Sequence, residues 1–348
     1  MCSREPQVEN EMKQSQRWVT MAEVAEEACV STITVSRVIR TPEKVAGATR
    51  ARVQEVIARL GYVPNEGAGA LSSRQNRTVG ALIPTLIGSA FTSTIDGLSA
   101  RLRAAGHQLL FACTDYSKDK EEDFIATMLR RRPTGLVLTS TAHTREAETL
   151  LRNCRIPVVE VWELPEATAH HAVGFSNRDG GFAMVRYLYE LSYRRVGFIG
   201  RPKTSVRSFQ RFAGYKEASR EYGDGVIRRA VEKNFGPNNV ERGAREFAAL
   251  MAHWPDTDAV FCANDTLALG ALSEAQRMGL TVPDDVAIAG FGDFEFADEF
   301  GVGLTTVRVP GFRIGELAAQ LILNHEKDAS QGIQKIDVGY EIVRRRTA

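Results

Sequence analysis

The chain has 348 residues, of which 43% are hydrophobic and 25% are charged, values typical of globular proteins and sufficient for two or three domains. Its five cysteines are scattered and form no Cys-x-x-Cys pair, so the composition favours neither a disulfide framework nor a zinc ribbon and suits a reducing cytoplasm. Residues 1–16 are polar, and no stretch approaches the roughly 20 apolar residues that a bilayer requires, so we expect neither secretion nor membrane insertion. The net charge of +1 does not by itself indicate a polyanionic partner.

The charge is nevertheless distributed unevenly along the chain. Residues 37–77 contain eight basic and three acidic side chains, a local net charge of +5. Charge sorting of this kind occurs on solvated helical faces and on nucleic-acid-binding surfaces, and charge alone favours the first. The local sequence decides in favour of the second.

Two short helices separated by a tight turn are predicted near the N-terminus. Residues 20–23, Thr-Met-Ala-Glu, have the form of a capping box, and Ser31 has the position of an N-cap for a second helix over residues 32–40. A third helix is expected over residues 48–60, ended by Gly61. Apolar residues repeat at helical spacing in all three, so the pattern predicts a helix-turn-helix unit with one small core.

In such a unit the second helix enters the major groove of DNA, and its first residues meet base edges. We therefore expect Thr32 and Ile33 to read sequence. Arg37 is suited to a bidentate contact with guanine, worth on the order of 1–3 kcal/mol of discrimination.

Residues 19–71, which include VTMAEVAEEACVSTITVSRVIR and LGYVPN, resemble the headpiece of the lactose/galactose repressor family, and the resemblance continues to the C-terminus. It implies a homodimeric bacterial transcription regulator that binds near-palindromic operator DNA through the headpiece and a hinge helix, with Leu71 wedged into the minor groove. The residues expected at the DNA are Thr20, Ser31, Thr32, Ile33, Thr34, Ser36, Arg37, Asn65, Ala68, Leu71 and Arg74.

The headpiece departs from the family pattern at three places. Cys29 replaces the usual turn glycine, which places a non-glycine residue in a left-handed conformation at a cost of roughly 1–2 kcal/mol. Ala46 replaces a serine cap, with a loss of about 1 kcal/mol. Gly67 and Gly69 each lower the helix propensity of the hinge by roughly 1 kcal/mol relative to alanine. We predict a hinge that is disordered without DNA. An ordinary flexible linker would also be disordered, so for the free protein the two interpretations agree.

After the hinge, seven short apolar runs alternate with helical stretches, a pattern that predicts parallel sheets covered by helices. The predicted fold is an all-α helix-turn-helix headpiece joined to an α/β core of two doubly wound parallel-sheet lobes, like a periplasmic binding protein. The expected divisions are a disordered tail 1–18, a headpiece 19–64, a hinge 65–78 and a core 79–348, with lobe 1 at about 79–174 and 310–335 and lobe 2 at about 175–309 and 336–348. Ligands of such folds bind at the carboxyl ends of the strands, here between the lobes.

The resemblance also implies where an effector binds. Phe91, Arg211 and Asn264 match pocket positions of the family, although Asn264 is equally suited to capping a helix and Phe91 to plain core. Trp162 and Gly292, followed by Asp293, stand where members that bind neutral sugars carry carboxylates, and Arg207 stands four residues before Arg211. On a helix these two arginines share a face, so the cleft suits an anion, and the alternative is that Arg207 is an exposed surface charge.

Residues 160–162, Glu-Val-Trp, together with Gly292 resemble the gluconate-utilisation branch of the family. The expected effector is thus a sugar acid such as gluconate or its phosphate, and a neutral sugar is the alternative. The sequence leaves open whether the effector induces or corepresses.

Two other classes of protein fit the sequence less well. An enzyme is disfavoured because no nucleophile, Walker or metal motif is present; His170 and His171 are expected in a surface loop, and residues 119–123 at the solvated start of a helix. A sugar-transport protein would carry a signal peptide and no headpiece. No cofactor and no metal are expected, and the lack of leucine heptads near the C-terminus favours a dimer.

Overall fold

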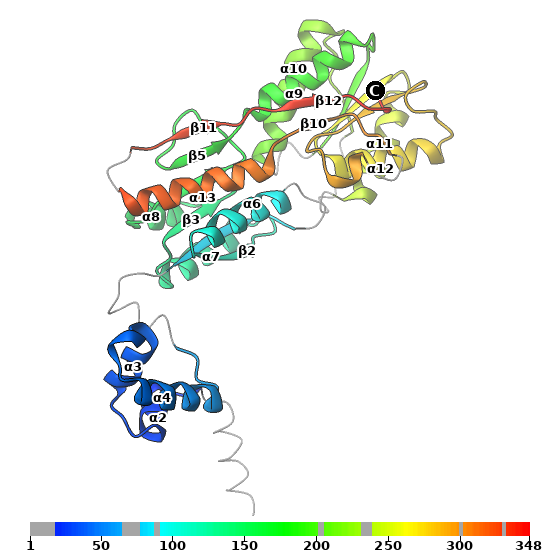
Figure 1. Cartoon of the computed structure of the whole chain (residues 1–348). Coiled ribbons are helices and arrows are strands. Elements are labelled where there is room, and N and C mark those ends of the chain that lie inside the picture. The colour runs from blue at the N-terminus through cyan, green and yellow to red at the C-terminus, as the bar shows by residue number, and fades with distance from the viewer. Residues whose placement is uncertain are drawn as a thin grey trace, which may run out of the picture. The chain divides into compact units, whose positions relative to one another are not determined.

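The computed structural model describes residues 18–64, 77–86, 91–200, 205–230, 239–298, 302–328 and 332–348. The chain divides into two compact units, Met1–Asn76 and Arg77–Ala348, which are described separately and drawn in Figure 1. None of the described helices is both long enough and apolar enough to cross a membrane.

The first unit is a small bundle of helices, and its helices confirm the predicted helix-turn-helix. They are α2 (Met21–Glu27), α3 (Thr32–Arg40), the 3₁₀ turn η1 (Pro42–Lys44) and α4 (Gly47–Leu60). Their apolar positions meet in one core, formed by the buried residues Val24, Ala25, Ala28, Val35, Val38, Val53, Val56 and Tyr62. The turn between α2 and α3 needs a left-handed residue, and Cys29 adopts this conformation with φ of 51°. Ala46 begins α4 without a side-chain cap, as expected from its lack of a hydroxyl.

The second unit contains two parallel sheets, which confirm the two-lobed core. The first sheet has the strand order β11-β5-β4-β3-β1-β2 and is parallel throughout. Its strands are β1 (Thr78–Ile83), β2 (Gln108–Cys113), β3 (Gly135–Leu138), β4 (Val158–Val161), β5 (His171–Gly174) and β11 (Lys335–Asp337).

Helices cover both faces of this first sheet. They are α6 (Phe91–Ala104), α7 (Lys118–Arg130), α8 (Arg145–Asn153) and α13 (Gly311–Lys327). Along the strands, alternate residues face opposite sides: Val79 and Val137 join the cluster that includes Leu98 of α6, whereas Leu136 joins the cluster that includes Ile125 of α7. Burial on both faces explains why the inner strands β1, β3 and β4 are mainly apolar runs.

The second sheet has the order β7-β6-β8-β9 and is also parallel. It is formed by β6 (Val196–Ile199), β7 (Arg228–Arg229), β8 (Ala259–Cys262) and β9 (Ala287–Ala289), and its helices are α9 (Asn177–Glu190), α10 (Val206–Tyr222), α11 (Val240–His253) and α12 (Asp265–Arg277). Helices α9 and α10 approach so closely that a Cβ atom on Gly214 would lie 2.1 Å from the carbonyl oxygen of Arg178. Only glycine permits that backbone separation.

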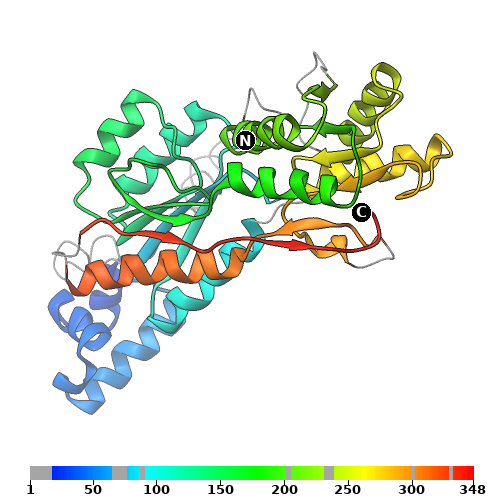
Figure 2. The same ribbon diagram turned by 90° about the horizontal axis from the view of Figure 1, so that it is seen from above.

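Three segments connect the lobes, as the orange and red parts of Figures 1 and 2 help to show. The chain first leaves β5 at Gly174 and enters α9. It returns through β10 (Thr306–Arg308) into α13, and crosses again from β11 to β12 (Glu341–Val343). Strands β10 and β12 pair antiparallel, so two of the three connections are hydrogen-bonded to each other.

The seven apolar runs predicted from the sequence contain β1, β2, β3, β4, β6, β8 and β9. Two other expectations were wrong. His171 lies in β5 and is 7% exposed, rather than in a surface loop, because β5 is covered on one side by β11 and Nδ1 of His171 accepts from the amide of Gln334. Glu121, in the stretch expected to be solvated, is only 6% exposed because its side chain is directed at a histidine of lobe 1.

Candidate functional site

The N-terminal ends of α2 and α3 are fixed by their own side chains. The hydroxyl of Thr20 accepts from the amide of Glu23 at 3.3 Å, and the Glu23 carboxylate accepts from the amide of Thr20 at 2.6 Å. Ser31 accepts from the amide of Thr34 at 3.2 Å, and the hydroxyls of these two residues lie 3.0 Å apart. These hydrogen bonds cap the N-terminal ends of α2 and α3. The side chains of Thr20, Ser31 and Thr34 therefore have a structural role in the free protein.

The outward face of α3 carries the side chains predicted to read bases. Val35 and Val38 are buried against α2 and α4, so the residues between them point outward. Thr32 and Arg37 are exposed, and Ile33 is 63% exposed, an unusual position for a large aliphatic side chain. An apolar residue that contributes nothing to the core is available to contact a partner such as a thymine methyl group.

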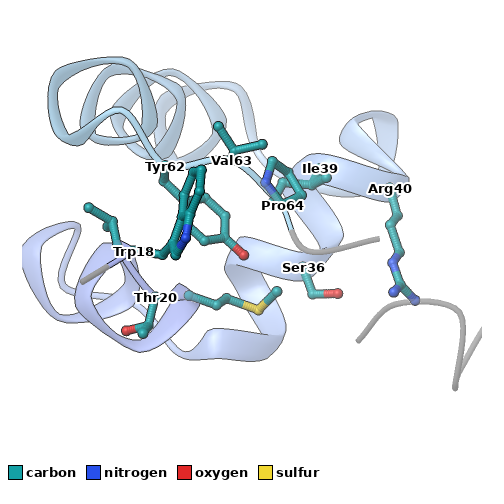
Figure 3. A pocket seen from close by; sticks show the side chains of 10 residues that line it. Trp18, Thr20, Ser36, Ile39, Arg40, Tyr62, Val63 and Pro64 are labelled. Atoms are coloured by element: carbon teal, nitrogen blue, oxygen red, sulfur yellow. The ribbon is translucent and has the colours of Figure 1, made fainter. Parts of the chain in front are cut away.

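A groove of about 550 Å³ lies beside this face (Figure 3). It is lined by Trp18, Val19, Thr20, Met21, Ser36, Ile39, Arg40, Tyr62, Val63 and Pro64. Figure 3 shows Arg40 at the end of the groove remote from Trp18. Ser36, predicted to contact DNA, therefore opens onto a mainly apolar groove. Sequence reasoning did not anticipate this groove, because Trp18 lies before the first helix and is 82% exposed.

The remaining predicted DNA contacts, Asn65, Ala68, Leu71 and Arg74, lie outside the described residues, as does the predicted hinge around them.

In the core, Arg207 extends from the first turn of α10 in lobe 2 to three groups of lobe 1. Its Nη1 donates to the carbonyl oxygen of Thr139 at 2.5 Å and lies 3.4 Å from Oε1 of Glu163, and its guanidinium stands 5.1 Å from the ring centre of Phe91. The side chain is only 11% exposed, so it is not the solvated surface charge that the sequence left open.

Arg211 lies one helical turn later and is buried, with 8% of its surface exposed. It donates through Nε to Oδ1 of Asn177 at 2.9 Å and through Nη1 to the carbonyl oxygen of Ala263 at 2.6 Å, and it stacks on Phe291 at 3.5 Å. Burial, followed by the charge of Arg207, lowers the pKa of Arg211 to about 9. Arg207 and Arg211 thus lie one turn apart on α10, and Asn177, which sequence reasoning missed, holds the guanidinium of Arg211.

A row of aromatic rings joins the cores of the two lobes at this level. Trp162 has φ of 75°, is 2% exposed, and donates from Nε1 to the hydroxyl of Thr94 at 3.0 Å. Its ring lies 5.2 Å from that of Phe91 and 6.1 Å from that of Phe175. Phe91 is thus both part of the core and the surface on which Arg207 lies.

The remaining predicted effector residues have structural partners. Asn264 caps α12 by accepting from the amide of Leu267 at 2.9 Å. Gly292 has φ of 131°, and a Cβ there would lie 2.3 Å from the ring of Phe294. The carboxylate of Asp293 binds Arg308 at 2.6 Å and Arg345 at 2.7 Å. Of the seven predicted effector residues, Arg207 alone lines the cavity beside it; the structure does not bring the other six to its lining, namely Phe91, Trp162, Arg211, Asn264, Gly292 and Asp293.

Two carboxylates instead occupy positions that the sequence did not reveal. Glu121 and Glu163 both line the cavity that borders Arg207, and Oε2 of Glu163 accepts from the hydroxyl of Thr141 at 2.8 Å. The cavity therefore has acceptor carboxylates at positions other than 162 and 292, where the sequence lacks them. No local pattern reveals these residues, because Glu163 and Arg207 are distant in sequence and meet only through the fold.

A buried histidine lies behind the cavity. Nδ1 of His143 is 3.2 Å from Glu121, Nε2 is 3.6 Å from Glu160, and the ring is only 4% exposed. Burial alone would lower the pKa of His143, but the two carboxylates raise it to about 9. The imidazolium therefore links α7 to β4 at neutral pH.

The cavity itself is small and is lined from both lobes. It measures about 100 Å³, well below the roughly 300–1,000 Å³ of pockets that enclose small-molecule ligands. Its lining comprises Leu82, Pro84, Thr114, Tyr116, Ser117, Lys118, Glu121, Thr139, Ser140, Ala142, Glu163, Ser205, Val206 and Arg207.

Comparison with known proteins agrees with both units. Residues 20–65 match the family described as bacterial regulatory proteins, lacI family, and residues 185–348 match the periplasmic binding protein-like domain. The transcriptional regulator GntR of Pseudomonas aeruginosa is 34% identical over 94% of this chain and 95% of its own length. The chain belongs to the LacI family. The HTH-type transcriptional regulator IdnR of Escherichia coli is 32% identical over 93% of this chain and 97% of its own length.

A solved LacI-family regulator from Silicibacter pomeroyi has a TM-score of 0.84 at 31% identity, over 94% of this chain and 99% of that one. These three relatives are regulators of transcription rather than enzymes. The chain is thus a DNA-binding transcriptional regulator with a ligand-binding core, and the relatives named GntR and IdnR match the gluconate branch that its sequence resembles.

Proposed function

We propose that this regulator represses transcription as a homodimer on near-palindromic operator DNA, and that a sugar acid such as gluconate or its phosphate controls it from the cleft between the lobes. The observation that carries the effector assignment is the pair of guanidinium groups, Arg207 and Arg211, one turn apart on α10. Arginine binds carboxylate and phosphate through paired donors, and an anion between two neighbouring cations relieves their repulsion.

Carboxylates in the cleft complete the recognition. A sugar acid carries several hydroxyl groups besides its anionic end, and hydroxyl groups need acceptors when they leave water. Glu163 and Glu121 are buried acceptors in the same cavity. In our proposal Glu121 takes a hydroxyl group, while the arginines take the anionic end in place of Glu163.

The same carboxylates support the second candidate, a neutral sugar. An ion pair such as Arg207–Glu163 offers a donor and an acceptor to the hydroxyl groups of an uncharged ligand. Direct comparison of an aldonate with a neutral hexose decides between the two.

Calorimetry on the full chain compares the binding of gluconate with the binding of glucose. We expect gluconate to bind and glucose to bind much more weakly. An R207A variant should lose gluconate affinity by about tenfold or more, the factor that 1.4 kcal/mol represents. Arg220, exposed near the end of the same helix, provides the matched control as R220A. Glucose binding without gluconate binding would refute the sugar-acid proposal.

On the DNA side, we propose that Thr32, Ile33 and Arg37 on the outward face of α3 read bases, while the caps at Thr20 and Ser31 place the helix ends near phosphates. Gel-shift assays on genomic fragments test this proposal. Affinity must fall steeply with salt, because each phosphate contact releases a counterion.

For the dimer, we propose that the edge of the first sheet contributes to the interface. Strand β2 is an edge strand, and on it Leu110 is 39% and Phe111 is 44% exposed. Unprotected apolar edge strands favour association, so a partner is expected to cover them. Light scattering of an F111D variant should show dissociation; a dimer unchanged by F111D would exclude β2 from the interface.

A further inference from the structure

The contacts of Arg207 form a bridge between the lobes that exists without any ligand. The bridge begins on α10 and ends on three separate segments of lobe 1, at Thr139, Glu163 and Phe91. Its charged component is the pairing of Arg207 with Glu163, whose side chains are only 11% and 4% exposed. A carboxylate of the chain therefore already occupies a position on the guanidinium that an anionic effector would need.

Glu163 is held in this position by its surroundings. The hydroxyl of Thr141 donates to Oε2 at 2.8 Å, which leaves Oε1 directed at Arg207. Its backbone lies against the end of β5, where a Cβ on Gly174 would come within 2.5 Å of the Glu163 nitrogen. The carboxylate is thus preorganised on lobe 1.

The space around the pair shows that a ligand cannot simply be added to it. The cavity of about 100 Å³ is too small for a sugar acid when pockets for small ligands measure roughly 300–1,000 Å³. An effector must therefore move the lobes apart or displace side chains, and Arg207 is the side chain that spans the gap.

We propose that Glu163 is a specificity-determining residue: it forms a latch with Arg207 that holds the lobes together, and it competes with the carboxylate of an anionic effector for the same guanidinium. This inference rests on the proposed sugar-acid function for its ligand, but the latch itself is a property of the free protein. When an anion replaces Glu163 on Arg207, two negative charges share a site shielded from water, which weakens binding. Glu163 thereby sets the concentration of anion that is needed to open the cleft.

The experiment compares the E163Q variant with the parent full-length chain by calorimetry. Glutamine keeps the size of the side chain and its bond from Thr141 but removes the competing charge. We expect E163Q to bind gluconate at least about tenfold more tightly, which corresponds to 1.4 kcal/mol, and not to tighten the binding of glucose. A merely structural role for Glu163 would affect both ligands alike. Unchanged or weaker gluconate binding by E163Q would overturn the proposal.

Control variants separate the charge from the fold. An E217Q variant breaks the exposed Arg178–Glu217 pair of lobe 2 and should bind gluconate as the parent does. If E163Q does not fold, T141V is measured in its place. Loss of the Thr141 hydroxyl frees the Glu163 side chain, so T141V should tighten gluconate binding by a smaller factor than E163Q. T141S keeps the hydroxyl and should bind gluconate with the affinity of the parent. Equal affinities for T141V and T141S would contradict the latch.

A second measurement needs no effector and so distinguishes failure of the latch from failure of the sugar-acid proposal. Trp162, next to Glu163, is 2% exposed and is one of three tryptophans. In a W18F, W254F background, E163Q should increase the quenching of Trp162 fluorescence by acrylamide, because the lobes separate more often. If the parent binds no gluconate, the effector assignment fails, and the quenching result alone decides the latch: equal quenching in parent and E163Q refutes it.

Discussion

The protonated state of His143 should make the stability of the core depend on pH. The imidazole lies between Glu121 and Glu160 at 3.2 Å and 3.6 Å, and its pKa is raised to about 9 from 6.5 in spite of burial. Because the proton is bound more tightly in the folded state, the resulting stabilisation is complete below pH 6.5 and disappears as the pH rises through 9. At 1.36 kcal/mol for each pKa unit, the full contribution is about 3 kcal/mol.

The groups that face His143 determine its pKa, and substitutions of His143 and of these groups test it. Glu121 comes from α7 and Glu160 from β4, while His170 has a pKa that is lowered first by burial and also by the charge of His143. An H143Q variant removes the proton-binding site, so the difference in unfolding free energy between parent and variant should shrink by about 3 kcal/mol between pH 6 and pH 10. An E160Q variant removes one carboxylate and should lower the pKa of His143.

Urea denaturation of the full chain at several pH values, followed by tryptophan fluorescence, measures the stability difference. Nuclear magnetic resonance of the histidine ring protons gives the titration of His143 directly. An H253Q variant, which removes an exposed histidine at the end of α11, controls for the substitution. Parallel pH dependences for parent and H143Q, or a His143 resonance that titrates near 6.5, would refute the reasoning. Either result would show that Glu121 and Glu160 do not stabilise the protonated form of His143.

Three further outcomes are expected. R37A should lose about 1–3 kcal/mol of discrimination at one operator position in anisotropy assays with single-base variants; a uniform loss across sequences would instead assign Arg37 to phosphate. T20A should lower the local stability of α2 by about 1 kcal/mol in amide hydrogen exchange, since it removes the hydroxyl that accepts from the amide of Glu23, and unchanged exchange would contradict that. Binding of gluconate should be accompanied by proton uptake near pH 9, because a bound anion raises the lowered pKa of Arg211. Calorimetry in two buffers measures this uptake, and a binding enthalpy that does not depend on the buffer would show that the anion lies elsewhere.

The headpiece could be predicted closely from the sequence because its structure is determined locally. The capping box at Thr20, the cap at Ser31 and the apolar repeat act within a few residues of themselves. Even the unfavourable conformation of Cys29 could be predicted, because the turn geometry requires it whichever residue is present.

The core was predicted less completely, since its missing parts depend on long-range pairing. Strand β5 is short, begins with a histidine and gains its burial from β11, which comes much later in the chain. Strands β10 and β12 stabilise each other across the lobe connection and carry no apolar run. In the same way, Glu163 is an ordinary surface-type residue until the fold places it beside Arg207.

The close contact of α9 and α10 has a consequence for how this regulator can acquire a different effector. A Cβ on Gly181 would lie 2.6 Å from the carbonyl oxygen of Arg211, just as one on Gly214 would collide with α9. Helix α10 is therefore locked in register against its neighbour and cannot slide or rotate to carry its side chains to new positions. Evolution toward a new ligand must proceed by exchanging side chains such as Arg207 on a fixed backbone, so single substitutions at that position should change ligand preference without remodelling the lobe.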